Sequence, residues 1–280
     1  MLSRTTAKEI QTIESRSAGT VHARRVMLVI QAFTHLSGVD HGPSELAAAT
    51  GLNITVVYRI LQSGIDTSIF LRVPPGRYRL GPGAAQIGTQ AMAAAALDTE
   101  AARPVLERLS LTADGFAQLW VLSPYGGPRK AYAASAPGRY DFESLGLSAA
   151  DLIEVGHSLR VGAAGRVIAA HLPPCLVSGI LEQSLPAGAG AVQTAAEFTA
   201  SLPEIRTSGY ALARDEIPGW SEVAAPVMWG DAVYGAVCVL KPSSLMPVDL
   251  ALPTITATAA AAERLTLLVS GEGDRYAAVG

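Results

Sequence analysis

Four polar side chains recur at helical spacing within one short segment: Thr55, Tyr58, Arg59 and Gln62. Apolar residues at positions 57, 60 and 61 supply the buried stripe of a helix expected over residues 54–65. Hydroxyl, guanidinium and amide groups donate and accept hydrogen bonds at base edges and phosphates in the major groove of a duplex. The alternative is an ordinary solvated helix face, so the neighbouring elements must decide between the two interpretations.

The flanking segments predict the order helix, turn, helix, hairpin over residues 43–81. Pro43 suits the first turn of a helix, because its missing N–H has no helical partner there. Gly51 can adopt the positive φ that ends this helix, and Asn53 can cap the next one. An earlier amphipathic helix begins near residue 22 and carries Arg25. The polar face therefore belongs to the last of three short helices.

The predicted hairpin is cationic. Arg72, Arg77 and Arg79 flank a Pro-Pro-Gly tip, and no acidic residue lies between Asp66 and Asp98 in the sequence. Such a hairpin is suited to clamp the phosphate backbone of DNA.

Charge is divided unequally along the 280 residues. Residues 1–80 contain nine Lys or Arg and five Asp or Glu, a balance of +4, whereas residues 81–280 contain twelve and nineteen, a balance of −7. A basic module on an acidic body suits an N-terminal segment that meets a polyanion. With 49% apolar and 16% charged residues, the chain fits two globular domains, each with its own core.

The sequence ATGLNITVVYRIL, followed by a short hairpin that ends in GRYRLG, resembles the winged helix-turn-helix of the IclR-type bacterial transcription regulators. The DNA-binding residues expected from the polar face and this resemblance are Arg25, Ser44, Asn53, Thr55, Tyr58, Arg59, Gln62 and Arg77. Gly64 and Ser68 depart from the family, which usually has a helix-packing leucine and a glycine at these positions. We therefore expect the end of this helix to be frayed.

Two further segments extend the resemblance to the second part of the chain. In residues 155–174, a Gly-Ala-Ala-Gly run at 162–165 precedes an amphipathic helix and resembles the effector loop of the family. Free backbone N–H groups there suit a small anion or carboxylate, and tight helix packing is the alternative. Residues 204–240 resemble two core strands of the family's GAF-like effector domain, and residues 249–269 its closing helix.

By position, the resemblance places the lining of an effector pocket on seven residues: Ala163, Ala164, Arg214, Asp215, Glu222, Cys238 and Leu240. Trp220 is added to this predicted lining. Leu240, Trp220 and Trp229 favour a ligand larger or more apolar than a small keto acid, such as an aromatic acid or amide. Arg160 or Arg214 suits a ligand carboxylate, whereas Glu222 would repel one and accept from a hydroxyl or amide. The alternative is that Glu222 and both arginines are surface residues.

Catalytic and metal-binding patterns are missing from the sequence. The five histidines form no recognised triad or metal spacing, and no GxSxG, GxGxxG or P-loop occurs. Asp215 and Glu216 are adjacent carboxylates that point apart. Two cysteines without a CxxC indicate a reducing compartment, and no segment reads as a signal peptide or an uninterrupted membrane span. We expect a cytoplasmic protein that is not an enzyme and that has no cofactor or metal.

The predicted fold is α+β with two domains: an N-terminal winged helix-turn-helix joined by a linker helix to a GAF-like α/β effector-binding domain. The expected boundaries are a flexible arm at 1–20, the DNA-binding domain at 21–81, the linker at 82–97, the effector-binding domain at 98–270 and a tail at 271–280. The predicted function is ligand-responsive regulation of a catabolic operon, with repression and activation both open. The predicted partners are double-stranded operator DNA, a small-molecule effector and further copies of the chain in a homodimer or homotetramer (dimer of dimers). A ligand sensor with protein rather than DNA output and a hydrolase are the alternatives.

Overall fold

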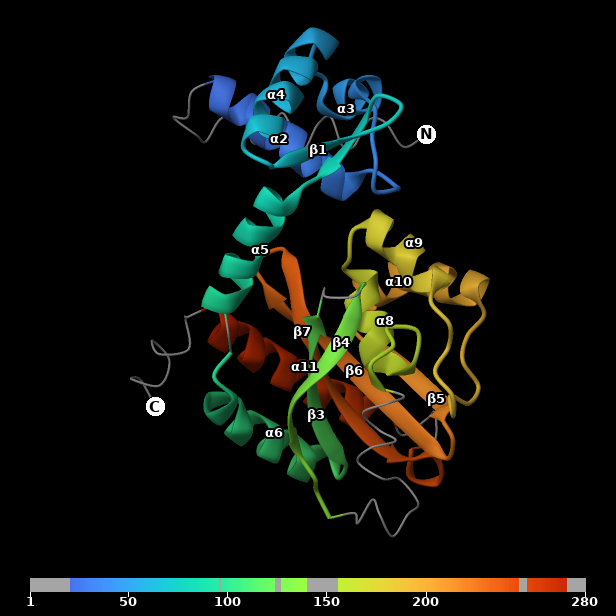
Figure 1. The fold of residues 1–280 in the computed structure, drawn as a ribbon. Helices are drawn as coiled ribbons and strands as arrows, with labels where there is room; N and C mark the ends of the chain where they lie inside the picture. The colour runs from blue at the N-terminus through green and yellow to red at the C-terminus, as the bar shows by residue number, and fades with distance from the viewer. Residues whose placement is uncertain (1–20, 96, 124–126, 140–155, 247–250, 271–280) are drawn as a thin grey trace. The chain divides into compact units, whose positions relative to one another are not determined.

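The computed structural model describes residues 21–95, 97–123, 127–139, 156–246 and 251–270 (Figure 1). The chain divides into two compact units, with the boundary between Ile87 and Gly88. The predicted arm at 1–20 and tail at 271–280 lie outside the described residues.

The first unit has the predicted order of elements. Three helices come first, α2 (Val21–His35), α3 (Pro43–Thr50) and α4 (Ile54–Asp66), followed by the strands β1 (Phe70–Val73) and β2 (Arg77–Leu80). The two strands pair antiparallel, from Phe70 opposite Leu80 to Val73 opposite Arg77. Helices and hairpin share one apolar core, whose largest buried side chains include Phe33, Leu61, Phe70 and Tyr78.

Helix α4 is fixed at both ends. At its start, Oδ1 of Asn53 accepts a hydrogen bond of 2.8 Å from the backbone N–H of Thr55, which confirms the predicted cap. The expected fraying at its end is wrong, because α4 continues through Gly64 to Asp66. A Cβ at Gly64 would lie 2.2 Å from Cδ2 of Phe70, a ring that stacks on Phe33 with centroids 5.3 Å apart. Glycine is therefore the residue that lets the hairpin pack onto α4.

Ser68 has a left-handed backbone conformation, with φ of +58°, directly after α4. Because a Cβ disfavours this conformation, Ser68→Gly is expected to raise the free energy of unfolding of the first unit by about 0.5–1 kcal/mol. Hydrogen exchange of the α4 amides in the full chain measures the change. Ser63→Gly, the same replacement inside α4, is the matched control and is expected to lower stability. A loss of protection in Ser68→Gly would contradict the argument.

The second unit is built on a five-stranded sheet with the order β4-β3-β7-β6-β5, in which all neighbours are antiparallel. The strands are β3 (Phe116–Ser123), β4 (Arg129–Ala136), β5 (Ala211–Ile217), β6 (Trp220–Trp229) and β7 (Ala232–Pro242). The two core strands predicted within residues 204–240 are thereby confirmed.

Helices cover both faces of this sheet (Figure 1). One face packs on α6 (Thr99–Ala113) and α11 (Ala251–Val269), and the other on α8 (Gly162–Ala170) and α10 (Ala195–Ser208), beside which lies α9 (Pro174–Glu182). Along β7, Val237 and Val239 belong to the first core, whereas Ala236 and Cys238 belong to the second. A short 3-10 turn, η1 (Ser243–Leu245), follows β7. This mixture of helices and sheet confirms the predicted α+β class.

Helix α5 (Pro82–Ala94) runs across the boundary between the two units, and none of its residues is buried. It covers most of the segment predicted as a linker helix and ends at Ala94. Among the helices that the structure describes, none combines the length and the apolar composition that a membrane crossing requires.

Candidate functional site

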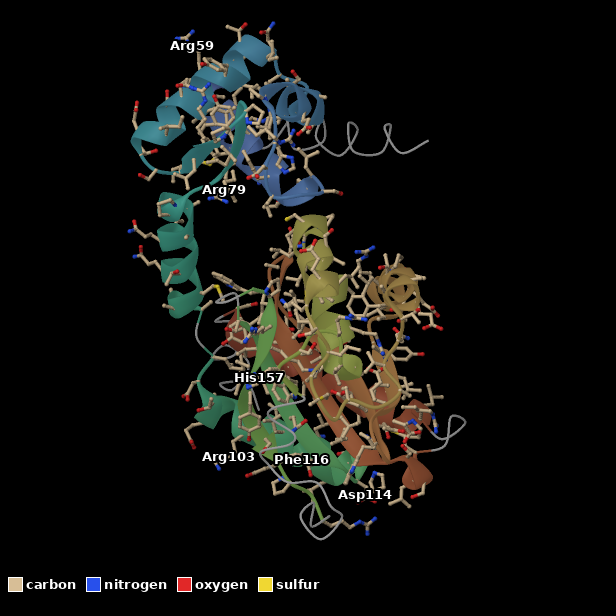
Figure 2. All side chains as sticks on the ribbon, turned by 45° about the vertical axis from the view of Figure 1, so that its right-hand side comes forward. Arg59, Arg79, Arg103, Asp114, Phe116 and His157 are labelled. Atoms are coloured by element: carbon tan, nitrogen blue, oxygen red, sulfur yellow. The ribbon has the colours of Figure 1, made fainter. Side chains whose placement is uncertain are left out.

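The outer face of α4 carries three of the predicted DNA-binding residues. Thr55, Tyr58 and Arg59 are exposed, on the side opposite the buried Val57 and Leu61. Figure 2 shows Arg59 projecting outward from α4. Within the described part of the chain, the side chains of Tyr58 and Arg59 form no ion pair or hydrogen bond, so both are available to a ligand.

The remaining predicted residues of the first unit have other surroundings. Gln62 is half-buried and donates through Nε2 to Oη of the buried Tyr78 at 2.9 Å, which ties α4 to β2. The side chain of Asn53 is used as the helix cap. Ser44 is exposed in the first turn of α3, and Arg25 is exposed on α2. The structure therefore groups Thr55, Tyr58 and Arg59 and assigns Gln62 and Asn53 to internal contacts.

Arg77, which the sequence placed among the DNA-binding residues, has an acidic partner that lies outside the hairpin. Its guanidinium donates to both carboxylate oxygens of Glu45 on α3, at 3.2 and 3.0 Å, and to the carbonyl oxygen of Asp40. Hydrogen bonds from the N–H of Gly42 and from Arg77 lower the pKa of Glu45. Arg72 and Arg79 are exposed and make no ion pair with any described residue. The unpaired cations of the hairpin are thus at positions 72 and 79.

In the second unit, the Gly-Ala run forms the first turn of α8 rather than a loop before it. Its backbone amides donate to carboxylates of the protein itself, whereas the sequence suggested a small anion or carboxylate ligand or tight helix packing. The two oxygens of Glu222, on β6, accept from the N–H groups of Ala163 at 2.8 Å and Ala164 at 3.2 Å. Glu216, on β5, accepts from the N–H of Gly162 at 2.7 Å. The interpretation of Glu222 as a surface residue is wrong, because it is 5% exposed.

Two buried cations accompany these carboxylates. Arg166, on α8, pairs with Glu216 and donates to the carbonyl oxygen of Leu212 at 2.6 Å. Nζ of Lys130, on β4, donates to the carbonyl oxygen of Val161 at 2.6 Å and lies 5.4 Å from the centroid of the Trp120 ring. Burial lowers the pKa of Lys130, and the nearby charge of Glu222 opposes this shift.

The side chains of Cys238 and Leu240 lie on β7, beside these charged groups. In the strand pairing, Leu240 is opposite Glu222 and Cys238 is opposite Ala224. Burial, followed by the charge of Glu222, raises the pKa of the Cys238 thiol well above its ordinary value. A thiol held protonated is a poor nucleophile. Leu240 and Trp220 are both buried and pack together with Phe116 and Ile217.

The structure does not bring the other predicted effector residues to α8. Arg214 donates to the carbonyl oxygen of Met246. Asp215 is exposed, with φ of +54°, and accepts from the hydroxyl of Ser243. A register shift between Arg214 and Ile217 separates the two neighbours, so that Asp215 faces outward and Glu216 inward. Glu216, Lys130 and Arg166 are the members of this site that the sequence patterns missed. The adjacent acidic pair at a strand end was the signal for Glu216.

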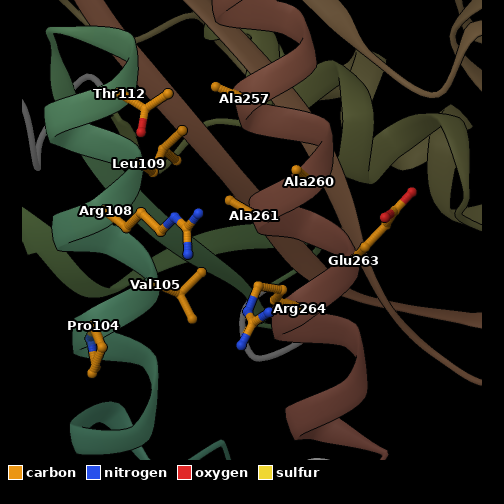
Figure 3. A pocket seen from close by; sticks show the side chains of 10 residues that line it. All are labelled: Pro104, Val105, Arg108, Leu109, Thr112, Ala257, Ala260, Ala261, Glu263 and Arg264. Atoms are coloured by element: carbon orange, nitrogen blue, oxygen red, sulfur yellow. The ribbon is translucent and has the colours of Figure 1, made fainter. Parts of the chain in front are cut away.

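A separate groove of about 540 Å³ runs between α6 and α11. Small and apolar side chains such as Val105, Leu109 and Ala261 line it. Figure 3 shows Arg108 and Arg264 reaching into the space between the helices. None of the predicted effector residues lines this groove. Across the described segments, no cluster of three or more His, Cys, Asp or Glu side chains has the arrangement of a metal site.

Comparison with solved structures identifies the fold. A protein of Silicibacter sp. TM1040, described as an IclR transcriptional regulator, matches 88% of this chain and 96% of its own, with 24% identity and a TM-score of 0.53. The corresponding values are 90%, 99%, 22% and 0.51 for an IclR transcriptional regulator of Alicyclobacillus acidocaldarius. They are 91%, 99%, 18% and 0.51 for an IclR homologue of Microbacterium hydrocarbonoxydans in complex with 4-hydroxybenzoate.

No protein-family model matches the sequence, and the search of curated proteins found no significant match. The similarity to these structures therefore rests on the fold, and the matched residues include parts of both units. It agrees with the resemblance seen in the helix-turn-helix segment and in the two segments of the second unit. The chain has the fold of the IclR-type transcriptional regulators.

Proposed function

We propose that the protein is a ligand-responsive transcription regulator of the IclR family, acting by binding rather than by catalysis. The first unit binds double-stranded operator DNA, and the second unit responds to a small molecule. The observation that carries the proposal is the outer face of α4, where Thr55, Tyr58 and Arg59 are exposed on a helix whose other side buries Val57, Ile60 and Leu61.

Rigid support of α4 favours recognition of a groove. The cap at Asn53, the bond from Gln62 to Tyr78 and the fit of Phe70 against Gly64 hold α4 from its start to its end. A helix fixed in this way presents its side chains to base edges at a defined depth. Arg59 supplies a bidentate donor for a base edge or a phosphate. The exposed Arg72 and Arg79 of the hairpin add contacts to the backbone of the duplex.

The ion pair between Arg77 and Glu45 gives Arg77 a different role from the one the sequence favoured. The pair joins β2 to α3 through two residues that are 32 positions apart in the chain. We propose that Arg77 sets the position of the hairpin and that the direct phosphate contacts come from Arg72 and Arg79.

The assembly proposed is a homodimer, or a homotetramer built as a dimer of dimers, in the cytoplasm. Two recognition helices related by two-fold symmetry read half-sites about one helical turn apart. Light scattering of the full chain after size exclusion measures the assembly, and a monomer at the concentration that saturates operator DNA would contradict it.

For the second unit we propose that the effector is a small aromatic acid or amide. This molecule would be a catabolite of the pathway that the regulated operon encodes. The relative from Microbacterium hydrocarbonoxydans was solved with 4-hydroxybenzoate. The apolar residues Leu240 and Trp220 lie beside the polar groups of β6 and α8, a combination suited to an aromatic ring with a polar substituent.

Arg59→Ala is expected to weaken binding to operator DNA by about tenfold or more, or about 1.4 kcal/mol, because it removes a cationic contact in the groove. DNA selected from a random pool by repeated binding serves as the probe, at several salt concentrations. Thermal stability is expected to be unchanged, since Arg59 is exposed.

Arg129→Ala, an exposed arginine on β4 of the second unit, is the control and is expected to bind DNA as the wild type does. Loss of folding in Arg59→Ala would make Arg59 structural. Wild-type binding that does not weaken as salt rises would instead contradict recognition of DNA, because phosphate contacts release counterions.

A further inference from the structure

The carboxylate of Glu222 occupies a place in which a ligand carboxylate would be expected. We propose that Glu222 is a built-in ligand of the second unit, which makes the unit reject small carboxylates. The contacts of Glu222 within the second unit show that the site is occupied. The consequence for the effector rests on the function proposed above. It narrows the chemical class of the effector from an aromatic acid or amide to a neutral amide or alcohol.

The amides that would bind a ligand anion are already used. The first amides of a helix have no partner within the helix and are therefore the natural donors for an anion. In α8 these are the N–H groups of Gly162, Ala163 and Ala164. The first is taken by Glu216 and the other two by Glu222, at distances of 2.7 to 3.2 Å. A second anion would have to displace one of these carboxylates.

The charges around α8 are balanced without a ligand. Lys130 and Arg166 are positive, Glu216 and Glu222 are negative, and all four are at most 5% exposed. An added carboxylate would give this buried group a net negative charge. Because an unbalanced charge away from water is strongly unfavourable, the cluster disfavours an anionic ligand.

The backbone at Gly162 is shaped for the Glu222 side chain. Gly162 has φ of +80°, and a Cβ there would lie 2.2 Å from Oε2 of Glu222 and 3.5 Å from Nζ of Lys130. Glycine at this position therefore makes the room that the carboxylate fills. The site that holds the Glu222 carboxylate is formed by three elements together, α8, β6 and β4, rather than by the end of one helix.

The first test uses the wild-type full chain and a matched pair of probes, 4-hydroxybenzoate and 4-hydroxybenzamide, which differ in charge but not in outline. Acetate and propionate are added as small carboxylates. Thermal shift and titration calorimetry are expected to detect no binding of the three acids. Any acid that binds and shifts the amide resonances of Ala163 and Ala164 overturns the proposal.

The second test removes the built-in carboxylate. Glu222→Ala is expected to bind propionate about tenfold more tightly than the wild type or better, and to gain thermal stability with propionate but not with chloride at equal ionic strength. Glu263→Ala, which removes an exposed carboxylate on α11, is expected to respond as the wild type does. If Glu222→Ala folds only when propionate is present, the proposal is supported. No gain in binding, or no refolding with propionate, overturns it.

The two proposals can fail separately. If Arg59→Ala bound operator DNA as tightly as the wild type, the regulatory function would lose its support. The carboxylate-binding results with Glu222→Ala would still stand. Tight binding of 4-hydroxybenzoate at α8 of the wild type would remove the role of Glu222 as a built-in ligand and leave the regulator standing.

Discussion

Arg166→Met is expected to lower the free energy of unfolding of the second unit by about 3–5 kcal/mol, because it leaves the Glu216 carboxylate buried without its cation. Glu216 and Arg166 are each 3% exposed, so water cannot replace the lost partner. The carbonyl oxygen of Leu212 loses a donor as well. Urea denaturation of the full chain measures the change through tryptophan fluorescence, since all three tryptophans lie in the second unit.

The control is Arg264→Met on α11, where the guanidinium is exposed, and a change within about 0.5 kcal/mol is expected. The double variant Arg166→Met with Glu216→Leu is expected to recover part of the loss, because it removes the unpaired charge together with its partner. A small loss in Arg166→Met alone would mean that the ion pair contributes little beyond packing.

Gly64→Leu is expected to destabilise the first unit by about 3 kcal/mol or more, and Gly64→Ala by about 1–3 kcal/mol. The added Cβ would lie 2.2 Å from Cδ2 and 2.6 Å from Cε2 of Phe70. The Phe70 ring is 1% exposed and stacked on Phe33, so it has no free space into which to move. Hydrogen exchange of the amides of α4 and β1 reports the loss in the full chain.

Gly88 provides the matched control for this prediction. It lies in α5, and a Cβ there would meet no atom within 4 Å. Gly88→Ala is therefore expected to be neutral or stabilising by up to about 1 kcal/mol, since alanine is the better helix former. Equal effects at Gly64 and Gly88 would exclude the contact with Phe70 as the cause.

The elements of the first unit could be predicted from the sequence because their signals are local. Pro43 at the start of α3, Gly51 after its end and Asn53 before α4 each act within one turn of the residues they fix. The strands β6 and β7, which meet at a turn at Gly230, were predicted from the resemblance of residues 204–240 to two core strands of the family. The residues expected to face DNA were predicted from the helical spacing of polar side chains and from the resemblance to a family. The residues expected to line an effector site were predicted mainly from the resemblance.

Contacts between distant positions could not be predicted in this way. Arg77 and Glu45 are 32 residues apart, and Gly162 and Glu216 are 54 apart. The inward turn of Glu216 depends on the register shift in β5, which interrupts the alternation that a strand pattern assumes. The fit between Gly64 and Phe70 needs the hairpin in place, so the sequence alone made Gly64 an unexplained departure from the family.

The alternation of side chains along β7 has a mechanical consequence. Cys238 belongs to the core under α8, while its neighbours Val237 and Val239 belong to the core under α6 and α11. Because interiors are close-packed, a sideways displacement of this strand on one face requires repacking on the other. A displacement of β7 caused by altered packing beneath α8 would therefore also change the contacts of β7 with α6 and α11.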